Sequence, residues 1–395
     1  MRKHVLFIVE NQWIPNDKRV WSEARLLNSI GYKVSIISPK DKHARKAFEN
    51  IDGIDIIRHP TINLGNGIIG FILEYGNALI WEIIISFIIY CRDRFDIIHA
   101  ANPPDDLFVI GLLYKIVGVK FIYDHHDLSP ELYLAKYRNK KNIIYNILLI
   151  MEELSCKIAD VIIATNTSYK NIEIERDKVN AEKIFIVRYG PNLEIMKRKE
   201  EIELIRAIYK TVLCYLGSIN IQDGVDISLN VLANLVHKYG ITDTCLLIIG
   251  DGDYLEEIKK IANKLKVEEY VIFTGFVRQA NELNRLLSTA DIFVDTAPYS
   301  FLNDNSTFMK IMEYLIYERP IVSFALKESM FSIGEAGVFV TPNDTDEMAR
   351  VIVGLIRDES MRRRFALNAK KRANELKWEE VSGPLVEAYQ WLNDK

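Results

Sequence analysis

The sequence lacks several features that would assign it at once to a familiar class of protein. Of its four cysteines, no two lie at the C-x-x-C spacing of a zinc or redox site, and each stands in an apolar stretch. We therefore expect buried free thiols. The formal net charge of -4 offers no basic excess for binding nucleic acid. No low-complexity tract or short-period repeat divides the 395 residues, and that length predicts two domains.

A long uninterrupted hydrophobic run is also missing. Residues 67–91 are apolar and long enough to cross a bilayer, but Glu74 and Glu82 interrupt them. The longest unbroken run, Ile83–Cys91, is far shorter than the roughly 20 residues of a spanning helix. We favour a mostly buried helix over one that lies on a membrane face, and a spanning helix least. The apolar run that opens the chain stops at Glu10 without a cleavage site, which predicts a first strand in a cytoplasmic protein.

What the sequence does contain is an alternation of short apolar runs with helical patterns. The runs are four to seven residues long and rich in Val and Ile, which is typical of buried parallel strands. We predict strands at His4–Glu10, Lys33–Ser38, Ile54–Arg58, Ile97–Ala100, Lys120–Asp124, Val161–Ala164 and Ile184–Arg188, and, after a break, at Thr211–Leu216, Cys245–Ile249, Tyr270–Thr274, Ile292–Asp295, Pro320–Phe324 and Gly337–Val340. This repeated pattern predicts an α/β protein with two doubly wound domains.

Ligands of such folds bind outside the carboxyl ends of the strands. In the second half, Gly217-Ser218 ends one strand, and Gln222 precedes a helix whose free N–H groups suit an anion. Gly250 follows the next strand in an incomplete glycine fingerprint, where a plain turn is an equal alternative. Phe276-Val277 follows a third strand, where the main chain can meet a flat base. These positions are our candidate donor-binding residues.

The stretch 303–324 carries the most information. Asn303–Asn305 reads as a polar loop, after which Ser306 or Thr307 can cap a helix. Together with Phe308, the helix N-terminus would suit a diphosphate because its N–H groups are unpaired. We therefore expect a phosphate-binding turn here.

Glu313 lies seven residues after Ser306, two turns further along the predicted helix. That is roughly 10 Å along the axis, a separation that fits a diphosphate at the cap and a ribose diol at the carboxylate. Lys310 on the same face could neutralise phosphate. The helix is apolar nearly all round, and a glutamate within it needs a partner. Glu313 and Lys310 are therefore candidate catalytic and donor-binding residues.

The order of these pieces resembles glycosyltransferase family 4, a family of retaining enzymes with the GT-B fold. The resemblance rests on Gly217, Gly250-Asp251-Gly252, Phe273-Thr274-Gly275-Phe276-Val277, Ala290-Asp291-Ile292, Lys310-Ile311-Met312-Glu313-Tyr314 and Arg319-Pro320-Ile321-Val322. It extends to the first half, where the matching segments look like the branch that builds bacterial O-antigen, capsule and exopolysaccharide. Those segments are Asn102-Pro103-Pro104-Asp105 and the run from Tyr123 to Tyr133.

The resemblance implies two Rossmann-like domains facing across a cleft. Residues 1–195 would form the acceptor-binding domain and residues 196–376 the domain for the nucleotide-sugar donor. The helix of residues 377–395 would cross back to the first domain. The family's Glu–seven residues–Glu motif would place its ribose-binding glutamate at Glu313, but Asn305 stands where the first glutamate belongs.

The resemblance also implies roles in the first domain. His126 matches the family's active-site histidine and would contact the donor sugar. We favour it over its neighbour His125, although a pair that only packs and hydrogen-bonds is the alternative. We place Asn102, Asp127 and Arg19 on the acceptor side.

The implied activity is retaining transfer of a hexosyl or N-acetylhexosaminyl group from a nucleoside-diphosphate sugar, with UDP favoured. The acceptor would be a glycan or a lipid-linked glycan, and the leaving diphosphate would take the acceptor's proton, so we expect no cofactor and no metal. The segments 67–91 and 136–141 could hold the enzyme at the inner face of the cell membrane. The alternatives are an epimerase of the same fold, a dehydrogenase, which should show a full glycine fingerprint, and a non-catalytic partner subunit, suggested by Asn305.

Overall fold

The computed structural model describes residues 2–62, 68–137, 140–193 and 195–394. The chain forms two compact units, each described here by itself. Unit 1 comprises Met1–Arg188 together with Ser382–Lys395, and unit 2 comprises Tyr189–Val381.

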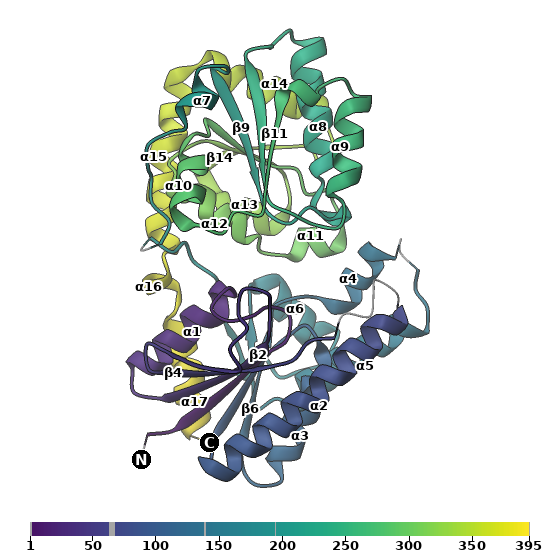
Figure 1. Cartoon of the computed structure of the whole chain (residues 1–395), viewed down its shortest axis with the longest axis vertical. Coiled ribbons are helices and arrows are strands. Elements are labelled where there is room, and N and C mark those ends of the chain that lie inside the picture. The colour runs from purple at the N-terminus through teal and green to yellow at the C-terminus, as the bar shows by residue number, and fades with distance from the viewer. Residues whose placement is uncertain (1, 63–67, 138–139, 194, 395) are drawn as a thin grey trace. The chain divides into compact units, whose positions relative to one another are not determined.

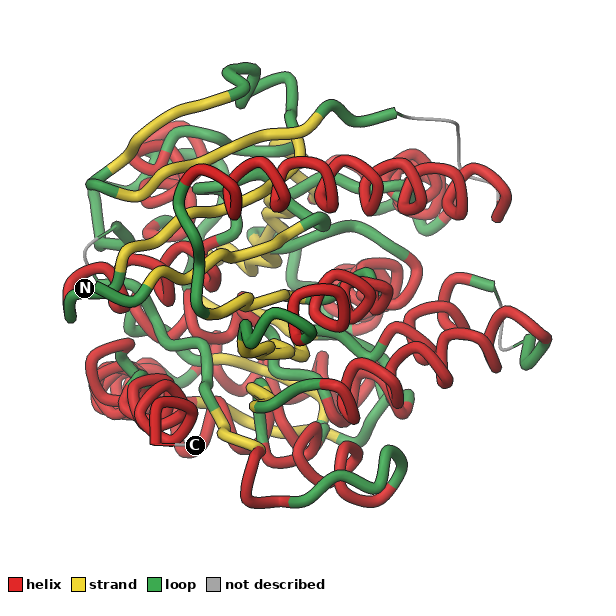
Figure 2. Tube along the Cα trace, turned by 90° about the horizontal axis from the view of Figure 1, so that it is seen from below, coloured by secondary structure: helices red, strands yellow, loops and turns green. Residues whose placement is uncertain are grey.

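Unit 1 is built on a sheet in which the described residues form eight strands, in the order β3-β4-β2-β1-β5-β6-β7-β8. Neighbouring strands are parallel, except that β3 is antiparallel to β4. The strands are β1 (His4–Val9), β2 (Lys33–Pro39), β3 (Phe48–Ile51), β4 (Ile54–His59), β5 (Ile97–Ala101), β6 (Lys120–His125), β7 (Val161–Ala164) and β8 (Ile184–Ile186). Figure 2 shows the strands as a twisted layer between helices.

The short strand β3 was missed by the sequence analysis. It forms a hairpin with β4 through Asp52 and Gly53, both with positive φ. An Asp-Gly pair between extended residues is a strong local signal for such a turn. The alternation of apolar and polar residues in β3 is weak, because this edge strand has no buried face.

The helices of unit 1 cover both faces of the sheet. They are α1 (Lys18–Ser29), α2 (Ile68–Arg92), η1 (Asp105–Leu107), α3 (Phe108–Lys115), α4 (Ser129–Lys136), α5 (Ile143–Ile158), α6 (Thr167–Glu175), η2 (Ala181–Lys183) and α17 (Gly383–Asp394). Asp17 caps α1 by accepting hydrogen bonds from the amides of Arg19 and Val20. Arg19 and Glu23, four residues apart, therefore both point from α1 into the unit.

The C-terminal segment is not the single helix that we expected from Trp378 to Asn393. It consists of α16 (Trp378–Val381) in unit 2 and α17 in unit 1, with the break at Ser382. Pro384 accounts for the break, since proline cannot continue a preceding helix but suits the first turn of a new one. Helix α17 packs against β7 and β8 and buries Tyr389, so the end of the chain completes the first unit (Figure 1).

Helix α2 is not the mostly buried helix that we favoured from its composition. The stretch Ile72–Arg92 has a mean hydropathy of 1.7 and meets the length and composition of a spanning segment, yet only 17% of it is buried. The buried positions include Ala78, Glu82 and Ser86, a stripe of small and polar residues at four-residue spacing. Several apolar side chains of α2, among them Ile80, Ile84 and Phe87, are therefore exposed, and Cys91 is exposed instead of buried. Residue 67 lies outside the described residues.

Unit 2 contains a second parallel sheet, which in the described part of the chain has six strands in the order β11-β10-β9-β12-β13-β14. The strands are β9 (Thr211–Leu216), β10 (Thr244–Ile249), β11 (Val271–Gly275), β12 (Ile292–Asp295), β13 (Ile321–Phe324) and β14 (Gly337–Val340). The helices are α7 (Glu203–Arg206), η3 (Ile221–Asp223), α8 (Val225–Ala233), the π-helical η4 (Asn234–Lys238), α9 (Leu255–Lys264), η5 (Glu268–Tyr270), α10 (Ala280–Ser288), α11 (Phe301–Asn305), α12 (Met309–Ile316), α13 (Lys327–Ile333), η6 (Gly334–Ala336), α14 (Thr345–Arg357), α15 (Glu359–Leu376) and α16.

Glycines allow main-chain segments to approach one another closely at the carboxyl edge of this second sheet. A Cβ atom at Gly224, whose φ is 68°, would lie 2.1 Å from the carbonyl oxygen of Thr296. A Cβ atom at Gly250 would lie 1.8 Å from the carbonyl oxygen of Gly217. Both contacts are far too short for any other residue, so close packing of two strand ends already requires the glycine at 250.

Candidate functional site

The sheet order of unit 2 points to one edge as its ligand-binding region. From β9 the chain builds outward through β10 and β11, then returns to the other side of β9 with β12. Ligands of open α/β sheets bind at this reversal, beyond the carboxyl ends of the strands. Gly217 follows β9 there, and a Cβ atom added to it would lie 3.7 Å from Cδ of Lys310. The first strand end and helix α12 therefore meet at the predicted position.

Lys310 is buried at this edge and already has a counter-ion. Its Nζ lies 2.9 Å from Oδ1 of Asp295, at the end of β12, and above the rings of Tyr215 and Phe308. Burial would lower the pKa of Lys310, but the charge of Asp295 outweighs it and raises the pKa above its ordinary value. Lys310 therefore stays charged and is paired with Asp295.

The start of α12 differs from the sequence prediction. Asn303–Asn305 belongs to the short helix α11, which the side chain of Ser300 caps, and is not a polar loop. Ser306 ends that helix and donates its hydroxyl to the carbonyl of Leu302, so neither Ser306 nor Thr307 caps α12. Serine hydroxyls commonly satisfy carbonyls one turn back in this way.

Helix α12 consequently begins at Met309, with Phe308 as an N-cap residue that makes no side-chain cap bond. Glu313 then lies only about 6 Å along the axis from the first residue, because each residue rises about 1.5 Å. The predicted separation of roughly 10 Å between the diphosphate and ribose contacts was therefore too long, and about 6 Å replaces it. Glu313 itself is 7% exposed, on a helix that is otherwise buried in the core.

The remaining donor-side candidates lie on the same edge. The side-chain amide of Asn303 ties the carbonyl of Gln222 to that of Pro298, and the amide of Gly250 donates to Gly275 at the end of β11. Beyond Gly275, Phe276 is 58% exposed. Of the other predicted donor-binding residues, Ser218 is exposed and Val277 is partly buried. The side chain of Asn305 donates to the carbonyl of Phe301.

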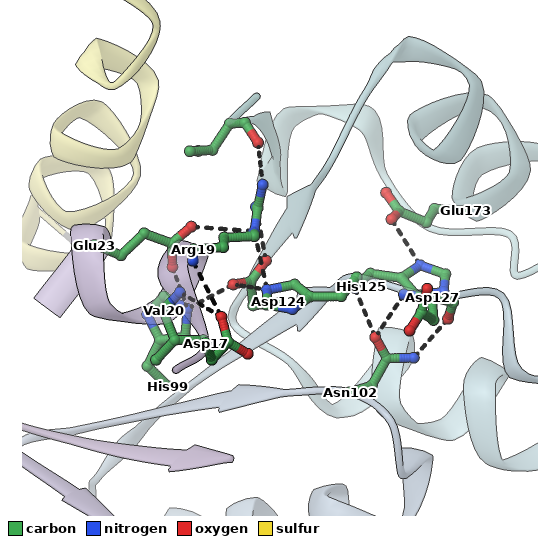
Figure 3. Close-up of polar contacts among 12 residues, drawn as sticks. Asp17, Arg19, Val20, Glu23, His99, Asn102, Asp124, His125, Asp127 and Glu173 are labelled. Carbon is green, nitrogen blue, oxygen red and sulfur yellow. Dashed lines mark hydrogen bonds and ion pairs between the residues drawn. The ribbon is translucent and has the colours of Figure 1, made fainter. Parts of the chain in front are cut away.

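In unit 1 the structure gathers the other candidates around Asp124, at the end of β6 (Figure 3). The guanidinium of Arg19 donates to Oδ1 of Asp124 at 3.1 Å, to Nε2 of His126 at 3.0 Å and to the carbonyl of Val187 at 2.8 Å. Nε2 of His126 also lies within hydrogen-bond distance of Oδ2 of Asp124. This one ring nitrogen either accepts from Arg19 or donates to Asp124, and either bond orients the ring of His126.

Two further buried residues support this cluster, and the sequence analysis missed them. Nε2 of His99 lies 3.3 Å from Asp124 Oδ2, and its Nδ1 lies 2.8 Å from the hydroxyl of Tyr389. Glu23 is fully buried, 3.3 Å from Arg19 Nε and 3.6 Å from His99 Nε2. The Arg19–Glu23 spacing of four residues was the available signal, since it predicts one helix face.

The pKa values of the two carboxyl groups in this cluster, Asp124 and Glu23, are shifted in opposite directions. Burial would raise the pKa of Asp124, but Arg19 and His126 outweigh it and hold that pKa well below its usual range. Burial and the charge of Asp124 raise the pKa of Glu23 well above its usual range. The electrostatics therefore favour the ionised form of Asp124 and the neutral form of Glu23.

Asn102 fixes the loop that carries His126. Its Oδ1 accepts the amide of His126 at 2.6 Å and that of Asp127 at 3.1 Å. Its Nδ2 donates to Oδ1 of Asp105 and to the carbonyl of Asp127, each at 2.7 Å. Burial raises the pKa of Asp127. The predicted residues Arg19, Asn102, His126 and Asp127 thus form one continuous cluster.

The neighbouring histidines lie in different environments. His125 is fully buried, with Nδ1 at 2.9 Å from Glu173 and Nε2 at 3.6 Å from Glu152. Burial would lower the pKa of His125, but these two glutamates raise it well above its usual value. The side chain of His126 is 14% exposed. Of the pair, His126 is the one that a ligand at the sheet edge can reach.

This fold with these two strand-end clusters is that of a GT-B glycosyltransferase. A family model described as Glycosyltransferase Family 4 matches residues 18–194, and one described as Glycosyl transferases group 1 matches residues 210–358. The chain belongs to glycosyltransferase family 4.

Two similar sequences are named as sugar transferases, and two solved structures share the fold. An uncharacterized glycosyltransferase of Methanocaldococcus jannaschii is 21% identical over 387 residues, 94% of each chain. A phosphatidyl-myo-inositol mannosyltransferase of Mycolicibacterium smegmatis is 27% identical over 174 residues, 44% of this chain and 42% of that one. Among solved structures, sucrose-phosphate synthase of Thermosynechococcus elongatus aligns with a TM-score of 0.78 at 17% identity over 100% of both chains. Anabaena HepE, solved in complex with UDP-glucose, aligns with a TM-score of 0.73 at 17% identity over 99% of this chain and 100% of that one.

Proposed function

We propose that the chain transfers a hexosyl or N-acetylhexosaminyl group, with retention, from a UDP-sugar to a glycan or lipid-linked glycan in surface polysaccharide synthesis. The observation that carries the donor half is the approach of Lys310 on α12 to Gly217, directly after β9, with Glu313 on the same helix. The UDP-glucose complex of a structural neighbour supports the choice of base, and family resemblance supports retention.

Each candidate has a role in this proposal. Glu313 accepts the two hydroxyls of the ribose, since a carboxylate can accept two O–H donors at once. Lys310 and the first amides of α12 stabilise charge on the leaving diphosphate. His126, oriented by Asp124 and Arg19, contacts the donor sugar near the reacting carbon. Transfer then depends on positioning and charge stabilisation, and the leaving diphosphate takes the proton of the acceptor hydroxyl.

The donor assignment predicts that one nucleoside diphosphate binds and that Glu313→Ala abolishes its binding. Calorimetry of UDP, GDP, ADP, dTDP and NAD with the purified chain measures this. Glu203→Ala, which removes an exposed glutamate on α7, is the matched control and should bind like the parent. Binding of NAD with no nucleoside diphosphate would contradict the proposed function. Nucleotide binding without transfer to any acceptor would instead favour a non-catalytic partner subunit.

We also propose that unit 1 docks on an anionic membrane surface and so reaches a lipid-linked acceptor. Helices α2, α3 and α5 lie side by side in Figure 1, joined by the Tyr114–Ser86 hydrogen bond and by packing of α3 on α5. Their exposed apolar residues are Ile72, Leu73, Ile80, Trp81, Ile84, Phe87 and Ile88 on α2, Leu112, Leu113, Ile116 and Val117 in and after α3, and Ile143, Ile147, Ile150 and Leu154 on α5. An outward apolar surface of this extent indicates a partner.

Charge indicates that this partner is an anionic bilayer. Arg92 and Arg94 are exposed at the end of α2, and Lys140 and Lys141 are exposed just before α5. Basic residues flanking an apolar helical face suit lipid headgroups around buried side chains. Residues 138–139 of the predicted basic segment lie outside the described residues.

Flotation with vesicles tests this surface. We expect binding to phosphatidylglycerol vesicles and much weaker binding to phosphatidylcholine vesicles, and we expect Ile84→Glu with Phe87→Glu to abolish it. Leu367→Glu, at an exposed leucine of α15 in unit 2, is the control and should bind like the parent. A lipid-independent dimer that the α2 changes dissociate would contradict the proposal and assign the surface to self-association.

A further inference from the structure

A second buried polar cluster in unit 1 has no part in the transfer described above. It joins Glu10, directly after β1, with His59 at the end of β4 and Glu82 on α2. One ligand atom from each of the three residues lies within 4.8 Å of the other two. Oε2 of Glu10 and Nε2 of His59 are 2.8 Å apart. Three separate elements thus converge on one point inside the unit.

The histidine is oriented as a metal ligand is. Nδ1 of His59 lies 3.1 Å from the carbonyl oxygen of Pro60. A carbonyl only accepts, so Nδ1 carries the proton and donates it. Nε2 is then the ring nitrogen that faces the carboxylate oxygen of Glu10. Metal-binding histidines characteristically donate their other N–H to a backbone carbonyl in this way.

The glutamate on α2 supplies the independent evidence for a ligand. Glu82 is 1% exposed, and its Oε1 has no hydrogen-bond partner among the described residues. Burial raises the pKa of Glu82 well above its usual value, and the neighbouring carboxyl groups of Glu10 and Asp106 raise it further. No described lysine or arginine forms an ion pair with Glu10 or Glu82. A buried carboxyl among like charges calls for a proton or a cation.

Another cluster of unit 1 has a similar composition but contains its own positive charge. Glu23, His99 and Asp124 also lie within 4.8 Å of one another. There, however, the guanidinium of Arg19 contacts both Glu23 and Asp124 and supplies the positive charge. His99 Nδ1 faces a tyrosine hydroxyl in place of a carbonyl. That cluster is complete without a metal, whereas the cluster of Glu10, His59 and Glu82 has no counterpart of Arg19 among the described residues.

We propose that Glu10, His59 and Glu82 bind one divalent transition-metal cation, of the zinc or manganese kind, that fastens α2 to the sheet. Two carboxylates and one imidazole are a common donor set for such ions, and water can complete the coordination. Ligand bonds of about 2.1 Å put neighbouring donor atoms about 3 Å apart, which the Glu10–His59 pair already approaches. The cation would anchor α2 through its polar stripe while its apolar face stays outward.

The residues of this site belong to unit 1 and are not among those proposed to take part in transfer, so the expectation that transfer itself uses no metal is unaffected by it. The proposed glycosyl transfer can be confirmed even if no metal binds here, and metal can bind here even if the proposed transfer is wrong. The test therefore measures metal binding and stability and leaves activity aside.

The experiment is elemental analysis of the full chain purified without chelator, followed by thermal unfolding after treatment with EDTA and addition of Zn²⁺, Mn²⁺ or Mg²⁺. We expect about one equivalent of bound metal and a rise in Tm with Zn²⁺ or Mn²⁺. Glu82→Gln and His59→Gln should each abolish both. Glu74→Gln, which changes a partly exposed glutamate on the same helix, should keep both.

A second measurement guards against variants that merely unfold. Without metal, Glu82→Gln should be at least as stable as the EDTA-treated parent, because it removes a negative charge beside Glu10. Absence of bound metal together with no metal-dependent rise in Tm would overturn the proposal. So would a rise that survives unchanged in both Glu82→Gln and His59→Gln.

Discussion

Replacing Lys310 by methionine will destabilise unit 2 by about 3–5 kcal/mol, because it leaves the carboxylate of Asp295 buried without its counter-ion. The Nζ–Oδ1 distance of 2.9 Å and the burial of both side chains make this one of the costliest single changes in the chain. Chemical denaturation of the variant and the parent measures the difference.

The double variant Lys310→Met with Asp295→Asn separates structure from function. Removing both charges should restore most of the stability, since no buried charge is left unpaired. Donor affinity and transfer should nevertheless stay low, because only the first amides of α12 then offset the charge of the diphosphate beside Gly217. A double variant that transfers sugar like the parent would show that Lys310 only balances Asp295.

Asp124→Asn should cause a comparable loss in unit 1, again about 3–5 kcal/mol, with a fall in kcat/KM of about 100-fold in whatever remains folded. The change removes the negative charge that pairs with buried Arg19 at 3.1 Å and that orients His126. Thermal unfolding and steady-state kinetics with the identified donor measure the two effects.

Glu23→Gln is the matched control for Asp124→Asn. Because the pKa of Glu23 is raised well above its ordinary value, the fold favours the neutral form, which glutamine imitates. We expect a change in stability within about 1 kcal/mol at pH 5. A loss as large as that of Asp124→Asn would show that Glu23 is ionised in the folded chain.

The pH dependence of this control follows from linkage. A carboxyl whose folded pKa lies above its unfolded value of 4.5 makes its full contribution to stability below that value and loses it as pH rises toward the folded pKa. Glutamine has no such loss. The stability of Glu23→Gln relative to the parent should therefore increase from pH 4.5 upward and be level below it, as thermal unfolding across a pH series will show.

Much of the fold could be read from the sequence because buried parallel strands are continuous apolar runs. Four strands, among them Val161–Ala164 and Ile292–Asp295, occupy the predicted residues. The other predicted strands differ from the observed ones by one or two residues at one or both ends, and β3 was not predicted. Strand β3 was missed because an exposed edge strand has no apolar run, although the turn at Asp52-Gly53 marked it. The helix break at Ser382 was also missed. The residues on both sides of it have helical periodicity, and we gave that pattern more weight than the helix-breaking Pro384.

The candidate residues were predictable where they directly follow a strand, as Gly217 and His126 do. The cap at Ser306 was wrong because local sequence could not show that Ser300 begins an earlier helix, which Ser306 ends. The burial of α2 was wrong because composition cannot tell which face of an apolar helix meets the protein. Here the polar stripe of Ala78, Glu82 and Ser86 faces inward.

The sequence by itself determined the two doubly wound domains, the family, and the strand ends where its chemistry gathers, because strand periodicity and glycine turns are local properties. Only the tertiary structure decided which side chains neutralise one another. Asp295 meets Lys310 and Arg19 meets Asp124, across 15 and 105 residues of sequence. Such pairs depend on which strands the sheet places side by side, and electrostatic energy depends on distance and burial, neither of which a linear sequence contains.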